Sequence, residues 1–142
     1  MTQLQREAIC RRLDTIRHAV ERLRAHRDVP LGEYLADEDE QWIVERGLQR
    51  AAEAVLDVCS QMAAALHLPA PQDYAESVDR MALAGVLPPD FVATFRKMAG
   101  FRNVLVHGYL DLDPRIVHAT LQEHLDDFLR FARLVAAYLP RV

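Results

Sequence analysis

The stretch Phe101–Tyr109 brings together the side chains of this sequence that are best suited to chemistry. Arg102 carries a permanent charge on a planar guanidinium, which can hold two oxygens of an anion. His107 carries an imidazole, the side chain that ordinarily gains and loses a proton near neutral pH. Asn103 and Tyr109 add an amide and a phenol. This stretch is therefore the candidate site.

Arg102 has an unusual position on its predicted helix. At about 100° per residue, it falls in the middle of the apolar stripe of that helix. The stripe consists of Phe91, Phe95, Met98, Leu105 and Val106. An unpaired buried guanidinium is very unfavourable, so Arg102 must be paired or must face a cleft or a subunit interface. A salt bridge to an acidic neighbour in the same bundle and a functional role are both open at this point.

His107 lies on another side of the same helix. It follows Arg102 by five residues, which separates the two side chains by about 140° on a regular helix. Either the helix loosens near Gly108, or the pair is assembled across a two-fold axis between two chains. The alternative for His107 is a partly exposed histidine that interacts with the C-terminus of its helix.

The apolar pattern predicts that helices position these residues. Apolar side chains recur at spacings of three and four, and no segment alternates convincingly with a period of two. The predicted helices span residues 3–27, residues 37–67, Asp73 to about Gly85, Pro88 to Gly108, and Asp113 to Leu139. The spacing of Asp73 and Glu76 predicts a capping box. The sequence therefore predicts an all-α fold, an antiparallel helical bundle of about five helices forming a single domain over residues 1–142.

The composition is that of an ordinary globular chain. Of 142 residues, 51% are hydrophobic and 27% are charged, which excludes a disordered, collagen-like or disulfide-dense protein. The net charge of −4 excludes nucleic-acid binding by bulk positive charge, so any RNA contact must be local. With no leader and no run of about 18 apolar residues, we expect a soluble cytoplasmic protein without a membrane anchor. Cys10 and Cys59 lack metal-ligand spacing and are expected to be buried thiols.

Charge is unevenly distributed between the first two long helices. The first holds Arg6, Arg11, Arg12, Arg17, Arg22, Arg24 and Arg27, and the second begins with the acidic run Asp37–Glu40. A basic face that follows phosphates beside a repelling acidic edge is one interpretation. A solvated surface, with acids at a helix N-terminus, is the favoured one. A two-metal site in the acidic run is disfavoured, because four adjacent helical residues point in different directions.

The candidate residues spell R-N-x-x-x-H-x-Y from Arg102 to Tyr109. In an all-helical context this resembles the signature of HepT-like toxins within the HEPN superfamily (higher eukaryotes and prokaryotes nucleotide-binding). The similarity covers about residues 5–138. Its flanking matches are Leu48-Gln49, Asp57, Tyr74-Ala-Glu-Ser, Leu83-Ala-Gly-Val-Leu and Leu112-Asp113. Gly108 departs from the family pattern, in which bulkier residues are usual at this position.

The resemblance implies a metal-independent endoribonuclease without a cofactor, the toxin of a pair whose partner is a minimal nucleotidyltransferase antitoxin. RNA supplies its own nucleophile, so cleavage needs a proton acceptor or donor and a cation at the phosphate. The resemblance assigns these catalytic roles to His107 and Arg102. Asn103 is a supporting residue that orients His107 or the phosphate, or else belongs to the helix surface. The resemblance makes Tyr109 the site of adenylylation, and it implies a homodimer with active sites at the two-fold interface.

Two other classes of function remain as alternatives. One is a catalytically silent HEPN module that binds nucleotide or serves as a scaffold for a nucleotidyltransferase. The other is a generic four-helix interaction domain. The intact Arg102, His107 and Tyr109 favour the ribonuclease, because a scaffold has no physical need for an arginine in an apolar stripe. For Tyr109, packing in the loop before the last helix is the alternative to modification.

Overall fold

The computed structural model describes residues 1–108 and 112–142. Its helices are α1 (Gln3–Arg24), α2 (Leu31–Ala36), α3 (Glu38–Ala65), α4 (Tyr74–Leu83), α5 (Pro89–His107) and α6 (Pro114–Tyr138), and a short 3₁₀ helix, η1 (Leu139–Arg141), follows. No strand occurs in the described ranges. The predicted all-α bundle is confirmed, and α2 is an addition to the helices that the sequence predicts.

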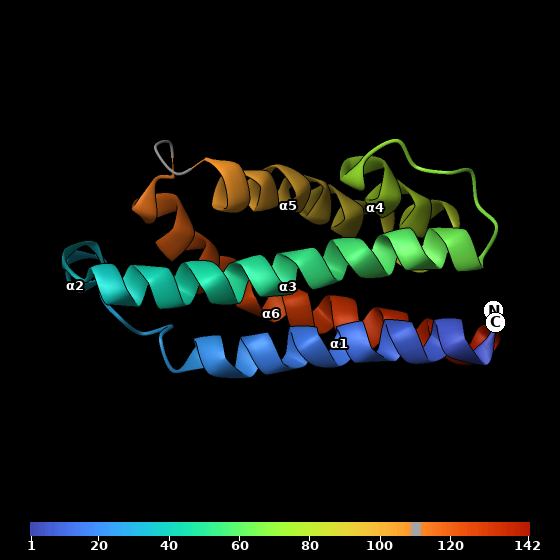
Figure 1. Ribbon diagram of the computed structural model, residues 1–142, viewed down its shortest axis with the longest axis horizontal. Helices are drawn as coiled ribbons and strands as arrows, with labels where there is room; N and C mark the ends of the chain where they lie inside the picture. Colours follow the sequence, from blue (N-terminus) through green and yellow to red (C-terminus); the bar gives the residue numbers. More distant parts are fainter. Residues whose placement is uncertain (109–111) are drawn as a thin grey trace.

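The long helices lie side by side along the long axis of the molecule (Figure 1). α1 and α5 run in one direction, and α3 and α6 run in the other, so the bundle is antiparallel. α3 packs against α1, α5 and α6, while α4 packs against α3 and α5. α5 ends at the same end of the bundle where α3 begins, next to α2 (Figure 1). The last turns of α5, which carry the candidate site, therefore lie beside the first half and the middle of α3.

The core sets the rotation of α5 about its own axis. Phe95 is fully buried, and its ring centroid lies 4.9 Å from that of Phe91, 6.1 Å from Phe128 and 5.3 Å from Phe131. Aromatic burial of this kind contributes strongly to packing, so this face of α5 is held inward. Arg102 follows Phe95 by seven residues, about two turns, and points toward the same side.

The helix boundaries follow their capping residues. The carboxylate of Asp73 accepts a hydrogen bond from the Glu76 N–H at 2.8 Å, which begins α4 as predicted. The Glu76 carboxylate accepts from the Gln72 N–H at 2.7 Å instead of from Asp73, so only half of the predicted capping box forms. α1 ends at Arg24, before the predicted residue 27.

The structure contains a helix, α2, in the segment between the first two predicted helices. α2 follows Pro30 and spans six residues, which is too short for the three-four apolar spacing to show. Its Tyr34 is fully buried and packs against His118 of α6, with ring centroids 5.3 Å apart. This tertiary contact stabilises a segment whose sequence alone resembles a connection.

The acidic run caps a helix. The carboxylate of Asp37 accepts a hydrogen bond from the Glu40 N–H at 3.1 Å, and the acids that follow lie in the first turn of α3. Glu40 also contacts His26, with Oε1 and Nδ1 separated by 2.6 Å. In residues 1–108 and 112–142 no three histidine, cysteine or acidic side chains are grouped so as to hold a metal ion. The structure thus supports the interpretation of the run as a helix N-terminus.

Most arginines of α1 have partners, so α1 does not present one continuous basic face. Arg12 pairs with Asp57, Arg17 with Asp14, Arg24 with Glu21, and Arg27, just beyond the helix, with Asp126; Arg6 donates to the backbone carbonyls of Leu139 and Val142. Arg11 and Arg22 form no ion pair with the other described residues.

The two cysteines differ in their surroundings. Cys59 is fully buried, as expected, and burial raises the pKa of its thiol far above the usual range. Cys10 is exposed on α1, so the expectation that both thiols are buried is wrong for Cys10. It precedes Leu13 by three residues but lies just outside the buried stripe of α1. No helix in the described part of the chain is long and apolar enough to cross a bilayer.

Candidate functional site

Arg102 is half-buried and held by three neighbours. Its Nη2 lies 3.4 Å from Oε1 of Glu53 on α3, and its Nη1 donates to Oδ1 of Asn103 at 3.1 Å. Its Cζ lies 5.6 Å from the ring centroid of Tyr74 at the start of α4. Of the two alternatives for an arginine in an apolar stripe, a salt bridge inside its own bundle is therefore present.

The guanidinium of Arg102 still has capacity to bind an anion. Its Nε is buried, without a hydrogen-bond partner in the described part of the chain, and is closed to an incoming anion, whereas 21% of the side-chain surface remains exposed. The contact with Glu53 is long for a hydrogen bond, and Glu53 keeps 34% of its side-chain surface exposed. Ion pairs of this exposure contribute only about 0–1 kcal/mol, so a phosphate that reaches Arg102 competes with a weak partner.

His107 is the last residue of α5 and is exposed to solvent. It forms no hydrogen bond or ion pair with residues 1–108 or 112–142. The N–H of Gly108 donates to the Val104 carbonyl at 2.9 Å, so α5 remains hydrogen-bonded to its end. The loosening near Gly108, which is one of the two alternatives from the sequence, does not occur. Arg102 and His107 thus point to different sides of one regular helix.

Asn103 is exposed and holds Arg102 rather than His107. Its amide oxygen accepts a hydrogen bond from Nη1 of Arg102, so Asn103 contacts the guanidinium rather than the imidazole. Tyr109, the predicted modification site, lies outside the described residues. The structure therefore brings Arg102 and Asn103 together and leaves His107 about 140° away on the helix.

Glu53 and Tyr74, the partners of Arg102, were not predicted from the sequence. Glu53 belongs to a set of charged positions on α3 with the same four-three spacing as its apolar face. This set contains Arg46, Arg50, Glu53 and Asp57. The signal was present in the spacing, but which helix faces this set depends on tertiary packing. For Tyr74, no pattern in the sequence indicates that the start of α4 reaches α5.

Asp57 lies one turn beyond Glu53 on α3 and carries an unusual carboxyl. Burial raises its pKa, and the nearby negative charge of Glu53 adds to the increase. Arg12, whose Nε is 3.8 Å from Oδ2 of Asp57, and Arg102 act in the opposite direction but do not cancel the effect of burial. The charged environment of Arg102 therefore includes two carboxyl groups on α3.

Asp57→Asn should stabilise the chain more at pH 7 than at about pH 4, relative to the unchanged sequence. A carboxyl whose pKa is raised by folding contributes stability that is fully present below its unfolded pKa and is lost as the pH rises through its folded pKa. Asparagine does not ionise and escapes this loss. Urea unfolding of both proteins at the two pH values measures the difference, with the exposed Asp14→Asn as the control for charge removal. A difference that stays constant with pH would contradict the prediction.

The amino-acid sequence of this chain is similar to those of known proteins. The sequence matches the family described as Ribonuclease HepT-like over residues 16–135. It is 27% identical over 139 residues to the tRNA nuclease HepT of Aphanizomenon flos-aquae, a match that covers 98% of this chain and 95% of that protein. It is 32% identical over 90 residues to the mRNA nuclease HepT of Shewanella oneidensis, which covers 63% of this chain and 68% of that protein.

The fold is also similar to that of a solved toxin–antitoxin complex. That structure contains the tri-AMPylated HEPN toxin of Shewanella oneidensis with its MNT antitoxin. The match to the toxin has a TM-score of 0.83 at 27% identity and covers 96% of this chain and 99% of that chain.

Proposed function

Because the chain belongs to the Ribonuclease HepT-like family, we propose that it is a metal-independent endoribonuclease, the toxin of a toxin–antitoxin pair. The observation that carries the proposal is the R-N-x-x-x-H-x-Y sequence, whose Arg102, Asn103 and His107 lie in the last turns of α5. There, an exposed imidazole and a partly exposed guanidinium with a weak ion-pair partner lie on one short length of helix. The two nuclease relatives and the toxin in complex with its antitoxin support the same function.

The proposed chemistry uses the RNA 2′-OH as the nucleophile. Its oxygen forms a bond to the adjacent phosphorus, the P–O5′ bond breaks, and the products are a 2′,3′-cyclic phosphate and a 5′-OH. His107 accepts the proton of the 2′-OH or donates one to the departing 5′ oxygen. Arg102 holds the phosphate oxygens on which negative charge grows, with Asn103 keeping its guanidinium in place.

We further propose that the working site is assembled in a homodimer. Arg102 and His107 point to different sides of a helix that stays regular to its end, so one chain does not direct both at the same atom. A two-fold axis beside α5 would bring the His107 of one chain toward the Arg102 of the other. Light scattering at micromolar concentration tests the dimer, and a monomer that cleaves RNA would contradict it.

The antitoxin in this proposal is a minimal nucleotidyltransferase that adenylylates Tyr109. The phenol oxygen attacks the α-phosphorus of ATP, the bond between the α-phosphorus and the bridging oxygen breaks, and pyrophosphate leaves while the phenol loses its proton. The tri-AMPylated state of the similar toxin supports this mode of neutralisation.

The purified chain should cleave single-stranded RNA in the presence of a chelator and leave an all-deoxy oligonucleotide of the same sequence intact. The nucleophile is the 2′-OH, so its removal stops the reaction, whereas removal of divalent metal does not. Gel electrophoresis follows the cleavage, and treatment of the products with phosphatase distinguishes cyclic from open phosphate ends.

The contrary outcomes of this experiment point to different functions. Loss of cleavage with the chelator, or cleavage of the DNA, would overturn the proposed mechanism. A chain that binds RNA or nucleotide but cleaves nothing, and that does not arrest growth when expressed alone, would favour the silent HEPN scaffold.

A further inference from the structure

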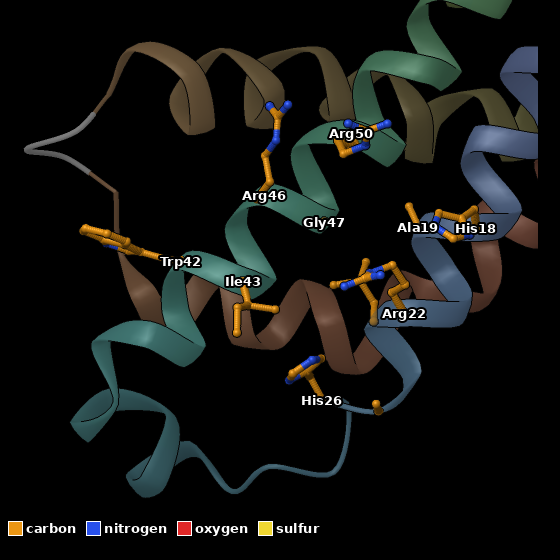
Figure 2. A pocket seen from close by; sticks show the side chains of 11 residues that line it. His18, Ala19, Arg22, His26, Trp42, Ile43, Arg46, Gly47 and Arg50 are labelled. Atoms are coloured by element: carbon orange, nitrogen blue, oxygen red, sulfur yellow. The ribbon is translucent and has the colours of Figure 1, made fainter.

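A groove of about 790 Å³ lies between α1 and α3 and contains residues with no role in the mechanism above (Figure 2). Arg22 and His18 of α1 line one side, while Arg46, Arg50 and Trp42 of α3 line the other. The groove is partly open to solvent rather than enclosed.

The groove concentrates positive charge on a chain whose net charge is −4. Arg22, Arg46 and Arg50 are exposed, and none forms an ion pair with the residues that the structure describes. None of the described residues that line the groove is acidic. This differs from the rest of α1, where most arginines are paired with carboxylates. A concave surface with three unpaired guanidinium groups attracts phosphates.

The groove also exposes a large aromatic side chain. Trp42 is the single tryptophan of the sequence, and it is 65% exposed. The neighbouring Ile43 is 50% exposed. Large apolar side chains gathered on a surface mark an interaction site. A tryptophan beside arginines matches the way proteins hold single-stranded nucleic acid, with bases stacked on aromatic rings and phosphates on basic groups.

The floor of the groove is shaped by Gly47. A Cβ atom at this position would lie 2.5 Å from Cδ2 of Leu23 on α1, so the glycine lets the two helices approach closely. The long side chains of Arg46 and Arg50 then flank this contact on α3, while Arg22 flanks it on α1. In Figure 2, Arg46 extends from α3 away from α1 and toward α5, so this side chain borders the groove on the side nearer to α5.

The basic residues of α3 follow one another at helical spacing toward Glu53, the partner of Arg102. Glu53 of α3 contacts Arg102, and Arg50, Arg46 and Trp42 lie about one, two and three turns before it on the same helix. Since α3 and α5 are antiparallel, this direction along α3 is also the direction from Arg102 to His107 along α5 (Figure 1). From Glu53 to Trp42 the helix advances by roughly 16 Å, so the basic surface reaches the end of α5.

We propose that this groove binds the single-stranded RNA substrate beside the bond that is cut. Phosphates bind Arg22, Arg46 and Arg50, and a base stacks on Trp42. The inference rests on the proposed ribonuclease function and adds to it a binding surface outside the R-N-x-x-x-H-x-Y residues. It identifies the substrate class as unpaired RNA several nucleotides long, because a duplex cannot offer an unstacked base to Trp42.

The first test measures binding without cleavage, in a His107→Ala background. As the only tryptophan, Trp42 reports directly, and its fluorescence should be quenched when an unstructured RNA oligonucleotide binds. Arg46→Gln with Arg50→Gln should weaken binding at least tenfold and lower the slope of log K against log salt by about 1.4, since each phosphate contact contributes about 0.7. Trp42→Ala, followed with labelled RNA, should weaken binding by about 5- to 150-fold with little change in that slope.

The matched control is Arg133→Gln, which removes an exposed arginine of α6 outside the groove. Its RNA affinity and its cleavage rate should equal those of the unchanged chain. In cleavage assays, the double arginine variant should raise KM for a long RNA with little change in kcat, and should alter KM for a dinucleotide much less. Circular dichroism establishes that each variant remains helical.

The outcomes separate this inference from the proposed function. If the groove variants bind RNA as tightly as Arg133→Gln, or if saturating RNA leaves Trp42 fluorescence unchanged, the groove is not the RNA site even when the chain cleaves RNA. If they instead dissociate a dimer or lose the antitoxin, a protein surface occupies the groove and the inference is wrong. If the groove binds RNA but the unchanged chain never cleaves it, the ribonuclease function fails and the RNA site stands.

Discussion

Replacing His107 with alanine should lower the rate of RNA cleavage by about 10²–10⁴-fold, the usual contribution of a general acid or base. The side chain is exposed and makes no hydrogen bond or ion pair with the described residues, so its removal should leave the folding free energy almost unchanged. Single-turnover cleavage of a labelled RNA measures the rate, and expression without the antitoxin tests whether growth arrest is lost with it.

The matched control for this variant is His124→Ala. His124 is a second solvent-accessible histidine, on α6, and it pairs with Asp127 at 2.9 Å rather than with any residue of the site. Its replacement should preserve both cleavage and growth arrest. A His107→Ala protein that cleaves RNA within a factor of ten of the unchanged chain would remove His107 from the mechanism.

Replacing Arg102 should also lower the rate of RNA cleavage, but two variants are needed to separate its role in catalysis from its role in stability. Arg102→Ala should lower cleavage by about 10²–10³-fold, and it also removes the partner of Glu53, which costs some stability. Arg102→Lys keeps the charge beside Glu53 yet lacks the planar fork that holds two phosphate oxygens. A folded lysine variant with strongly reduced kcat therefore assigns the loss to the bidentate binding of phosphate, whereas full activity would show that a positive charge at this position is sufficient.

The sequence was sufficient to predict the bundle because burial repeats along each long helix. α3 and α6 have one apolar face over their whole length, and Asp73 and Asp113 cap helices where the sequence predicts that they begin. α2 has too few turns for such a repeat, and it forms because Tyr34 packs in the core. Prediction succeeded where the signal is local and periodic, and it missed a helix that depends on a tertiary contact.

The residues of the candidate site remain a prediction, and their contacts were only partly predictable from the sequence. The angle between Arg102 and His107 follows from helix geometry, and the regular end of α5 preserves it. The identity of Glu53 as the partner of Arg102 depends on how α3 and α5 are aligned along their length, which no local pattern specifies. The same alignment places Arg46 and Trp42 toward the end of α5. The groove that they line depends on how the helices pack and could not be predicted from the sequence.

The closeness of Tyr109 to His107 in the sequence explains how a modification of Tyr109 would silence the proposed toxin. Tyr109 follows His107 by two residues, so their Cα atoms are at most about 7 Å apart whatever the intervening backbone does. A nucleotide attached to Tyr109 is thus confined to the neighbourhood of His107 and of the arginines that we propose bind RNA. Each adenylate adds a negative phosphate and a bulky base, which repel RNA and compete for the same cations.

Tyr109→Phe should therefore give a chain that folds, cleaves RNA and arrests growth, but that its nucleotidyltransferase partner can no longer silence covalently. In the proposed reaction the phenol oxygen attacks ATP, and phenylalanine removes only that oxygen, so the rest of the site is unchanged. Intact-mass measurement after co-expression should show adenylate additions on the unchanged chain and none on the variant, with Tyr138→Phe, which changes a tyrosine of α6, as the matched control. Growth should then be restored by the partner in the control and remain arrested in the Tyr109→Phe strain. If the partner neutralises the chain fully while Tyr109 stays unmodified, silencing occurs by covering the site, and the role of Tyr109 in regulation is wrong.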